Sequence, residues 1–526
     1  MNGDFLTHGA SEPTPCPLPQ GGGFSSRRGG AAVYWLIGIV CCVGTVLAMM
    51  LYNNIRERKR EATSTVLHIA EIDETTVDPA EWGKNFPRQY DGYTRTADNA
   101  SARFKWSEGR PPDDAVHADV QPQSSAAAKK APSKLDGDSR LKTIFNGYAF
   151  AIDYRERRGH AFMLFDQRET ERVKQKPQPG ACLNCHASNV VAYREVGLKS
   201  GAPGALTDPL LSEEGQKQLF AGFSAVNKMT YNDATHMVKH PVSCLDCHDP
   251  KSMVLRVTRP AFMEGIANLA KSDDPVPHLP SVEQWRKGDR KKDYNPNTLA
   301  SRQEMRSMTC AQCHVEYHFA GDDKRLTFPW HNGLKAEQME KHYDDIGWSD
   351  WTHKDSGAKV IKAQHPEFEL WSQGIHARSG VSCADCHMPY MREGAMKFTD
   401  HQVQTPMAHV NRSCQTCHNY TESEIKSRVD QIQSRSKAAL DRAEIAVVDL
   451  IQAIQAAAAA GATEEQLKTA RALQRKAQWR ADLMNAENSM GFHAPAEFLR
   501  ITGEAIDYAR QGQVEVAKLG KGTSAE

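Results

Sequence analysis

Five copies of one short motif constrain this chain more than any other feature. Each is a Cys-x-x-Cys-His pentapeptide, in which two thiols can bond to the vinyl groups of haem while the histidine binds the iron. One copy alone is weak evidence, because zinc sites also use paired Cys-x-x-Cys spacing. Zinc does not require a histidine directly after the second cysteine every time, so five complete copies favour covalent haem. The motifs occupy residues 182–186, 244–248, 310–314, 383–387 and 414–418.

The motif residues have two predicted roles. The cysteines expected to bind haem covalently are Cys182, Cys185, Cys244, Cys247, Cys310, Cys313, Cys383, Cys386, Cys414 and Cys417. The histidines expected to bind iron from the proximal side are His186, His248, His314, His387 and His418. The other three of the 13 cysteines are Cys16, Cys41 and Cys42, so no pair remains for a disulfide in the globular part.

Composition narrows the class of protein further. The 526 residues carry zero formal net charge, which argues against nucleic acid as a partner, because its binding needs a basic surface. The hydrophobic content of 40% is modest for this length. Five haem groups would supply much of the missing apolar core.

An uncharged apolar run at residues 31–52 is long enough to cross a bilayer as a helix. A cleaved signal peptide is the alternative, but the run is long for one and no small-x-small cleavage site follows it. More basic residues follow the run than precede it, and the positive-inside rule alone would leave the body in the cytoplasm. Covalent haem attachment in bacteria takes place outside the cytoplasmic membrane. We therefore predict a retained anchor with the body on the periplasmic side.

We expect a mostly α-helical multihaem cytochrome c fold with little β structure, because no convincing strand alternation occurs between the motifs. Residues 121–138 read as a flexible insertion. The predicted segments are a disordered N-terminus at 1–30, the transmembrane anchor at 31–52, a polar wrapping segment with the insertion at 53–140, a pentahaem catalytic body at 141–420 and a helical segment at 421–526.

The last segment predicts three helices. Apolar residues recur every three or four positions from Ile425 to Ile454, which is typical of a long amphipathic helix. Gly461 ends it, and Thr463 with Gln466 can form a capping box for the next helix. A third helix starts near Pro495. The apolar stripe predicts either core within the chain or a subunit interface, and the sequence leaves both open.

Longer blocks resemble the pentahaem ammonia-forming cytochrome c nitrite reductases, in that family's order from about Glu71 to the last helices. The blocks are residues 158–162, 168–172, 310–317, 328–330, 362–367, 374–376, 399–401 and 493–495. Three features depart from the family. Most members have lysine where this chain has His186, many have another aromatic residue at the position of His318, and many are soluble. His186 belongs to a minority branch and leaves two possibilities, an open reactive iron or an ordinary bis-histidine haem.

The resemblance implies a site in which the first motif carries an open catalytic haem and four bis-histidine haems relay electrons. The implied distal ligands are His401 for the second haem, His160 for the third, His493 for the fourth and His376 for the fifth. The implied catalytic residues around the open haem are Arg172, Tyr317 and His365. The implied calcium ligands are Glu316, Gln364 and the backbone carbonyls of Tyr317 and Lys362.

The activity implied is the six-electron reduction of nitrite to ammonium, with five covalent haem c groups and calcium as cofactors. The implied electron donor is a membrane cytochrome that oxidises quinol, and the implied assembly is a homodimer through the C-terminal helices. Two alternatives remain open from the residues alone. One is a multihaem cytochrome that only transfers electrons, and the other is a related enzyme acting on hydroxylamine or sulfite.

Overall fold

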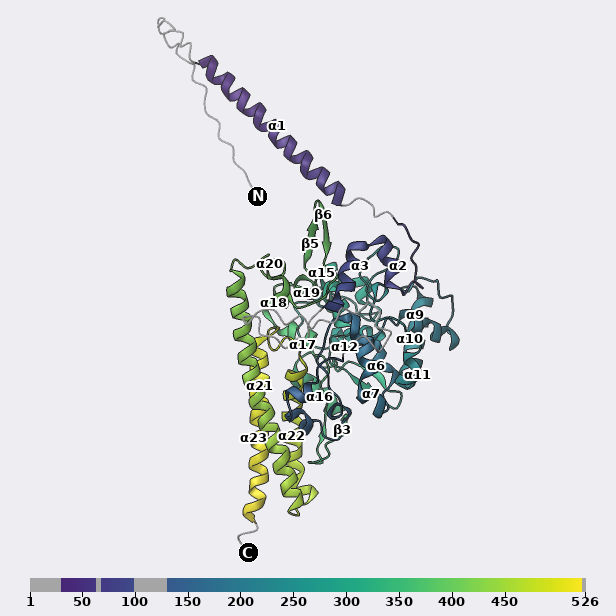
Figure 1. Cartoon of the computed structure of the whole chain (residues 1–526), viewed down its shortest axis with the longest axis vertical. Coiled ribbons are helices and arrows are strands. Elements are labelled where there is room, and N and C mark those ends of the chain that lie inside the picture. Colours follow the sequence, from purple (N-terminus) through teal and green to yellow (C-terminus); the bar gives the residue numbers. More distant parts are fainter. Residues whose placement is uncertain (1–29, 63–67, 99–129, 523–526) are drawn as a thin grey trace, which may run out of the picture. The chain divides into compact units, whose positions relative to one another are not determined.

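The computed structural model describes residues 30–62, 68–98 and 130–522, which are mainly helical (Figure 1). The expected disorder before residue 30 lies outside the described residues. Helix α1 (Gly30–Ala62) forms a unit of its own, and its residues 32–59 are apolar enough to cross a membrane and are fully exposed. Residues 65–393 and 397–526 form the second compact unit, which holds every haem motif together with the C-terminal helices.

The second unit is built from short helices joined by turns. Its helices before the first motif are α2 (Pro79–Asn85), α3 (Pro87–Thr94), α4 (Lys134–Gly137), α5 (Arg140–Ile144), α6 (Met163–Glu169) and α7 (Glu171–Gln175). The next are α8 (Leu183–His186), α9 (Val190–Lys199), α10 (Glu213–Lys228), α11 (Tyr231–Thr235), α12 (Pro260–Lys271), α13 (Pro280–Arg286), α14 (Pro296–Leu299) and α15 (Arg302–Ala311). The remainder before the C-terminal bundle are α16 (Ala336–Asp345), α17 (Glu367–Gln373), α18 (Ile375–Arg378), α19 (Cys383–His387) and α20 (Val410–Ser413).

Six 3₁₀ turns and three small hairpins complete the described body. The turns used below are η4 (His160–Phe162), η5 (Gly180–Cys182) and η6 (Cys244–Asp246). Each sheet has two strands, and they are β1 (His318–Ala320) with β2 (Arg325–Thr327), β3 (Trp351–Thr352) with β4 (Lys359–Val360), and β5 (Tyr390–Glu393) with β6 (Met396–Thr399). The expectation of a mostly α fold with little β structure is confirmed.

The segment before the motifs is bound tightly to the body. Trp82 of α2 is almost completely buried in the largest hydrophobic cluster. Glu74 accepts two hydrogen bonds of 2.8 Å from the guanidinium of Arg256, and both side chains are buried. A bidentate pair of this kind fixes orientation as well as distance.

The prediction of a flexible insertion at 121–138 is wrong for residues 130–138, the part that the structure describes. Leu135 of α4 is buried against Leu141, and Lys134 lies over the ring of Tyr154. Asp138 forms an ion pair with Arg140. The low-complexity composition stops near residue 130, and Leu135 then supplies an apolar contact that holds the following turn in the core.

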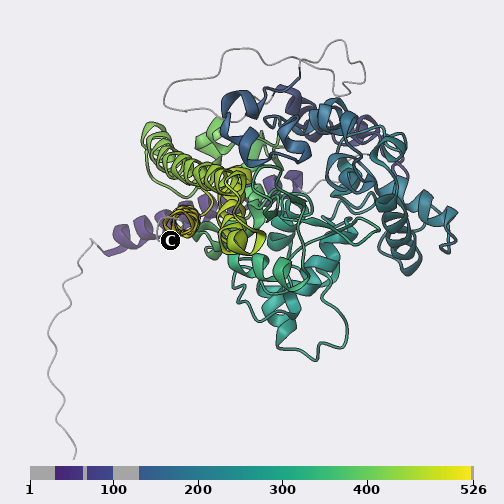
Figure 2. The ribbon, with the colours of Figure 1, turned by 90° about the horizontal axis from the view of Figure 1, so that it is seen from below.

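Three long helices, α21 (Glu422–Ala459), α22 (Glu464–Ala486) and α23 (Pro495–Gly522), lie side by side along one flank of the body (Figures 1 and 2). The predicted capping box is confirmed, because Gln466 N donates to Thr463 Oγ1 and Thr463 N donates to Gln466 Oε1 at 2.7 Å. Gly461, just after α21, has φ of +95°, a left-handed conformation that glycine adopts without strain.

The apolar stripe of α21 belongs to the core of the chain. Val447, Leu450, Ile451 and Ile454 have no exposed surface and pack with residues of α5, α22 and α23. They are therefore not available to a partner subunit. Ile445 on the same helix is 46% exposed and points away from this core.

This difference predicts a stability contrast along α21. Ile451→Ala removes buried methyl groups and should lower the free energy of unfolding by roughly 2–5 kcal/mol, whereas the matched Ile445→Ala should change it by less than about 0.5 kcal/mol. Urea unfolding followed by circular dichroism measures both. Equal changes in the free energy of unfolding would contradict the assignment of the apolar stripe to the core of the chain.

Candidate active site

Each haem motif forms a single helical turn. In the second motif, His248 N donates to Cys244 O at 2.9 Å, and the third and fifth motifs repeat this bond between the histidine and the first cysteine. A helical turn brings residues three and four apart onto one face. Both cysteines and the histidine of a motif can therefore reach the same haem.

Four motif histidines face a second histidine from a distant part of the chain. The distances between ring centroids are 6.2 Å for His160 and His314, 6.3 Å for His248 and His401, 6.2 Å for His376 and His418, and 6.4 Å for His387 and His493. A histidine nitrogen binds a transition metal at about 2.0–2.1 Å and its ring centroid lies roughly 1.2 Å further out, so two opposed ligands place their centroids about 6.4 Å apart. The four pairs fit bis-histidine haem.

Electrostatics favours metal ligation by these rings. Burial lowers the pKa of His160, His186, His248 and His387 to about 4, so each imidazole is neutral at pH 7, as a metal ligand must be.

The pKa of two other histidines in these pairs shifts in the opposite direction. Burial also opposes the charge on His314 and His493, but the neighbouring carboxylates of Glu367 and Glu487 outweigh it and raise the pKa of both rings.

The motifs lie next to one another in a defined order. The sulfur of Cys185 in the first motif lies against that of Cys313 in the third, and Cys310 of the third lies against Cys383 of the fourth. Ser413, directly before the fifth motif, donates to Cys386 O of the fourth at 2.9 Å. The first motif is thus connected to the fifth through the third and fourth.

Buried Arg259 joins the first and second motifs. Its Nε donates to Asn184 O at 2.6 Å and its Nη2 donates to Ala187 O at 3.0 Å. Its Nη1 donates to Asp246 Oδ1, inside the second motif, at 2.9 Å. A charge-assisted fork of this kind fixes the spacing of the two motifs.

His186 is the exception among the motif histidines. Its Nδ1 lies 3.1 Å from Met163 O, which orients the ring. Among the described residues no second histidine ring faces it at the distance seen for the other four motifs. Its haem would therefore keep one side free of a histidine ligand.

Arg172 on α7 lies near this first motif. Thr170 caps the N-terminus of helix α7, and its side chain accepts from Val173 N. The Arg172 guanidinium stacks on the ring of Phe150 at 4.2 Å and donates to Gln167 Oε1 and Asp153 O, each at 3.4 Å. Its positive charge acts on the Cys182 thiol and on the Tyr317 hydroxyl, lowering the pKa of each against the larger effect of burial.

Tyr317 and His365 also lie near the first motif. Burial raises the pKa of Tyr317 well above its ordinary value, and interaction with Cys182 and Cys185 adds to the rise. Burial lowers the pKa of His365 to about 3, with Glu367 opposing the shift and His314 and His186 adding to it. Both side chains therefore keep a neutral form at pH 7, in which each offers a hydrogen-bond donor. The ready protonation of His365 that its residue type suggests near neutral pH does not hold for this buried position.

The predicted calcium ligands also come together. Gln364 N donates to Glu316 Oε2 at 2.6 Å, and Gln364 Nε2 lies 3.4 Å from Lys362 O. Tyr317 follows Glu316 directly. If the Gln364 amide turned by 180°, its oxygen would face the same point.

The charge balance around Glu316 fits a cation. Glu316 has no exposed surface, and its carboxylate accepts from Tyr343 Oη at 2.8 Å and from an amide, which are neutral donors. The nearby Lys362 ammonium is paired with Asp482 at 2.9 Å. Burial raises the pKa of Glu316 well above its ordinary value. A calcium ion, which takes carboxylate, carbonyl and amide oxygens, suits this donor set.

The sequence and the fold are similar to one known family along most of the chain. The cytochrome c552 family model matches residues 78–525. The chain belongs to the cytochrome c552 family. Cytochrome c-552 of Parabacteroides distasonis is 34% identical over 494 residues, covering 92% of this chain and 86% of that protein, and cytochrome c-552 of Aliarcobacter butzleri is 30% identical with 92% and 85% covered.

A solved structure supports membership of the cytochrome c552 family. The chain matches the cytochrome c nitrite reductase of Desulfovibrio desulfuricans, a catalytic subunit described with two calcium sites. The TM-score is 0.64 and the identity is 26%, over 85% of this chain and 88% of that one. The resemblance to this family of oxidoreductases, expected from the sequence blocks, is confirmed.

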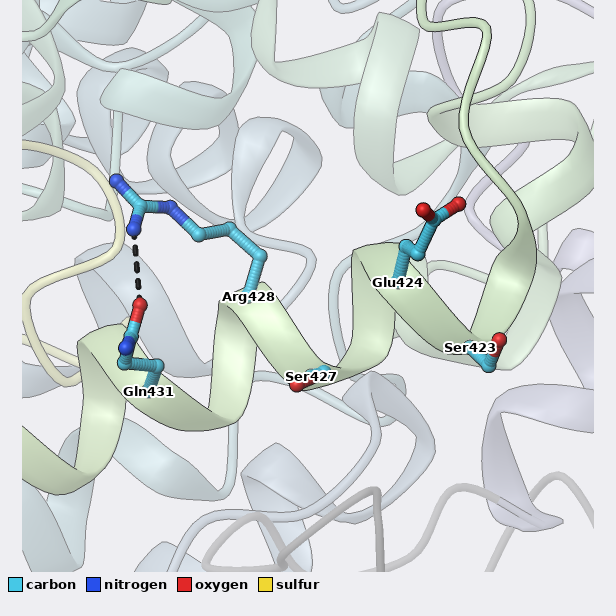
Figure 3. A pocket seen from close by; sticks show the side chains of 5 residues that line it. All are labelled: Ser423, Glu424, Ser427, Arg428 and Gln431. Carbon is cyan, nitrogen blue, oxygen red and sulfur yellow. Dashed lines mark hydrogen bonds between the residues drawn. The ribbon is translucent and has the colours of Figure 1, made fainter.

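Two other clusters do not compete with the haem sites of this cytochrome. Asp138, Asp441 and Glu444 bring three carboxylates together, but the guanidinium of Arg140 lies among them and pairs with all three. A surface depression near the start of α21 is lined by one helix alone, and in it Arg428 donates to Gln431 at 2.9 Å (Figure 3). Its lining residues are Ser423, Glu424, Ser427, Arg428 and Gln431.

Sequence reasoning missed the groups that hold Arg172 in place. Gln167 lies directly before one of the blocks that carry the family resemblance. Its position could therefore have indicated a residue close to Arg172. Phe150 and Asp153 gave none, because their contacts depend on how η4 and α6 fold back on the chain.

The motif geometry predicts five covalent haems per chain, because all five motifs are complete and folded as turns. Intact mass of the denatured protein should show five additions, with every motif cysteine bound. A mass that corresponds to four haems, with free thiols at Cys182 and Cys185, would show that the first motif binds no haem and would contradict the prediction.

Proposed function

We propose that this chain reduces nitrite to ammonium at the haem bound by Cys182, Cys185 and His186. The observation that carries the proposal is the difference among the motif histidines. Four face a second histidine and His186 has none in the described chain, while Arg172, Tyr317 and His365 lie near its motif. An iron with a free position beside one cation and two neutral donors suits a small anion that must take up protons. The similarity to the Desulfovibrio nitrite reductase supports the same reaction.

The reaction takes up six electrons and eight protons and yields ammonium and two water molecules. When bound, haem at the first motif supplies an iron that can hold the anion and pass it electrons. The residues of the chain bind the anion, orient it and supply hydrogen bonds. The adjacent third and fourth motifs offer the route by which electrons arrive one at a time.

Arg172 binds the anion through its fixed charge. Its guanidinium is held by the Phe150 ring and by two hydrogen-bond acceptors before any substrate arrives. A donor that is already oriented needs no rearrangement when charge develops on the nitrite oxygens.

Tyr317 and His365 act as donors to those oxygens. The raised pKa of Tyr317 keeps its hydroxyl proton in place, and the lowered pKa of His365 leaves a neutral ring with one N–H. His365 takes up an additional proton only when negative charge grows beside it. This arrangement ties proton delivery to N–O cleavage.

Arg172→Ala and His365→Ala should each lower nitrite turnover on the order of 10²–10³-fold, because each removes an oriented donor. Lys174→Ala, an exposed cation on the same helix as Arg172, is the matched control and should leave turnover unchanged. Assays with nitrite, hydroxylamine and sulfite separate the alternative substrates. Parental nitrite rates in both alanine variants would place the anion site elsewhere.

We further propose that calcium is bound by Glu316, Gln364 and the carbonyl oxygens of Tyr317 and Lys362. The ion would neutralise the buried carboxylate of Glu316 and hold the chain on either side of the pocket, because Tyr317 and His365 adjoin its ligands.

Glu316→Gln should lower bound calcium, since it removes the charged ligand. Elemental analysis after dialysis measures the content, and Tyr317→Phe is the control because its proposed calcium contact is through the backbone. Tyr317→Phe should keep calcium and disturb the fold less than Glu316→Ala. Unchanged calcium in the Glu316 variant would refute this ligand set.

We propose that α1 is retained as a membrane anchor and that the body lies in the periplasm, where haem is attached. The apolar, fully exposed residues 32–59 support this assignment. Membrane fractionation followed by N-terminal sequencing tests it, and a mature chain that begins after residue 52 would contradict it.

We also propose a quinol-oxidising multihaem cytochrome as donor and a homodimer formed by the exposed face of the C-terminal helices. Because Val447 and Ile451 are buried in the chain, the dimer contact must use outward residues such as Ile445. Sedimentation of Ile445→Asp should show a monomer with all haems attached, and an unchanged dimer would exclude that face.

A further inference from the structure

The haem-facing histidines differ in what their Nδ1 atoms contact. Those of His186, His248, His387 and His401 lie 2.8–3.1 Å from backbone carbonyl oxygens. Two others lie against carboxylates instead. His314 Nδ1 is 3.6 Å from Glu367 Oε2, and His493 Nδ1 is 2.8 Å from Glu487 Oε1.

The two carboxylates belong to adjacent haems. His314 is the proximal histidine of the third motif, and His493 faces His387 of the fourth. The sulfurs of Cys310 and Cys383 bring these two motifs into contact. The third motif also contacts the first through Cys313 and Cys185. The carboxylates therefore lie along the route to the open haem.

One short loop between α22 and α23 organises both pairs. Glu487 itself opens the loop and is held by donors from Ser489, whose Oγ donates at 2.8 Å and whose N donates at 3.0 Å. Asn488, the next residue, donates through Nδ2 to Glu367 and accepts from Arg157. Met490 and Gly491 have positive φ, which turns the chain back so that His493 reaches Glu487.

Both carboxylates are buried and their closest donors are neutral. Glu367 is 7% exposed and Glu487 is 2% exposed. Arg157 donates to Asn488, and its positive charge also acts on Glu367. A negative charge in such a place is weakly screened, so it acts strongly on a haem iron a few ångströms beyond the imidazole.

We propose that Glu367 and Glu487 are positioning residues that lower the reduction potentials of the third and fourth haems. The negative charge of a carboxylate close to the imidazole stabilises the ferric state of an iron bound by that ring. The backbone carbonyls at the other histidines supply a dipole and no net charge. The two haems that lead to the first motif thus hold electrons less tightly, and transfer onward to the open haem becomes more favourable.

The proposal rests on the histidine pairs as haem ligands and does not depend on nitrite as the substrate. The test is a spectroelectrochemical titration of the full chain with all haems bound, with electron paramagnetic resonance at each potential to identify the low-spin haems. Glu367→Gln and Glu487→Gln keep the shape of the side chain and remove its charge. Each should favour reduction of one low-spin haem at least tenfold, a rise of about 59 mV, with a different haem affected in each variant.

The matched control is Glu444→Gln, a buried carboxylate that pairs with Arg140 and Asn485 and contacts no haem histidine in the interactions described. It should leave all five potentials at parental values. Glu367→Asp keeps the negative charge on a side chain one carbon shorter. The reduction potential in this variant should lie between the parental value and that of Glu367→Gln. A merely structural role would instead move the potentials of all haems or convert one to high spin.

Two further variants keep the test decisive if either glutamine variant fails to fold. Asn488→Ala removes the hydrogen bond to Glu367, and Ser489→Ala removes the hydroxyl donor to Glu487, and both leave the carboxylates charged. In each of these variants the carboxylate loses one of its hydrogen bonds. The reduction potential should shift for the same haem that the Gln variant of that carboxylate affects. Parental potentials for the third and fourth haems in the variants that fold would overturn the proposal, while nitrite turnover in those variants tests the catalytic assignment separately.

Discussion

The opposed histidine pairs are the constraint on which the rest of the structure depends. Most helices of the body are too short to be stable alone, α18 and α19 having four and five residues. An iron bound between the two rings of a pair would tie residue 160 to 314, 248 to 401 and 387 to 493. Haem is thus as much a part of the proposed core as the side chains, and metal binding contributes to folding.

The geometry of the proposed active site follows from one of those pairs. His160 lies in η4, which leads through α6 into α7 and Arg172, and His314 is three residues before Tyr317. Binding of the third haem by both histidines would therefore bring the two sides of the proposed anion site together. Glu367, two residues after His365, contacts His314 as well, so the same haem is connected to every proposed catalytic residue.

The sequence alone predicted the mostly helical fold, the five motifs, the capping box at Thr463 and the residues that form the histidine pairs. Local signals and family blocks are sufficient for these. It failed for residues 130–138, where Lys134, Leu135 and Asp138 contact the body. It left the α21 stripe ambiguous because core and interface have the same periodicity. The supports of Arg172 and the carboxylates at His314 and His493 depend on distant packing, which no local pattern encodes.

The first haem alone is proposed to keep an open position. The most direct measurement is the electron paramagnetic resonance spectrum of the fully oxidised protein, with haem content determined on the same sample. We predict one high-spin ferric haem, sensitive to added nitrite, alongside four low-spin haems. Five low-spin haems that ignore nitrite would contradict it and would leave a cytochrome that only transfers electrons.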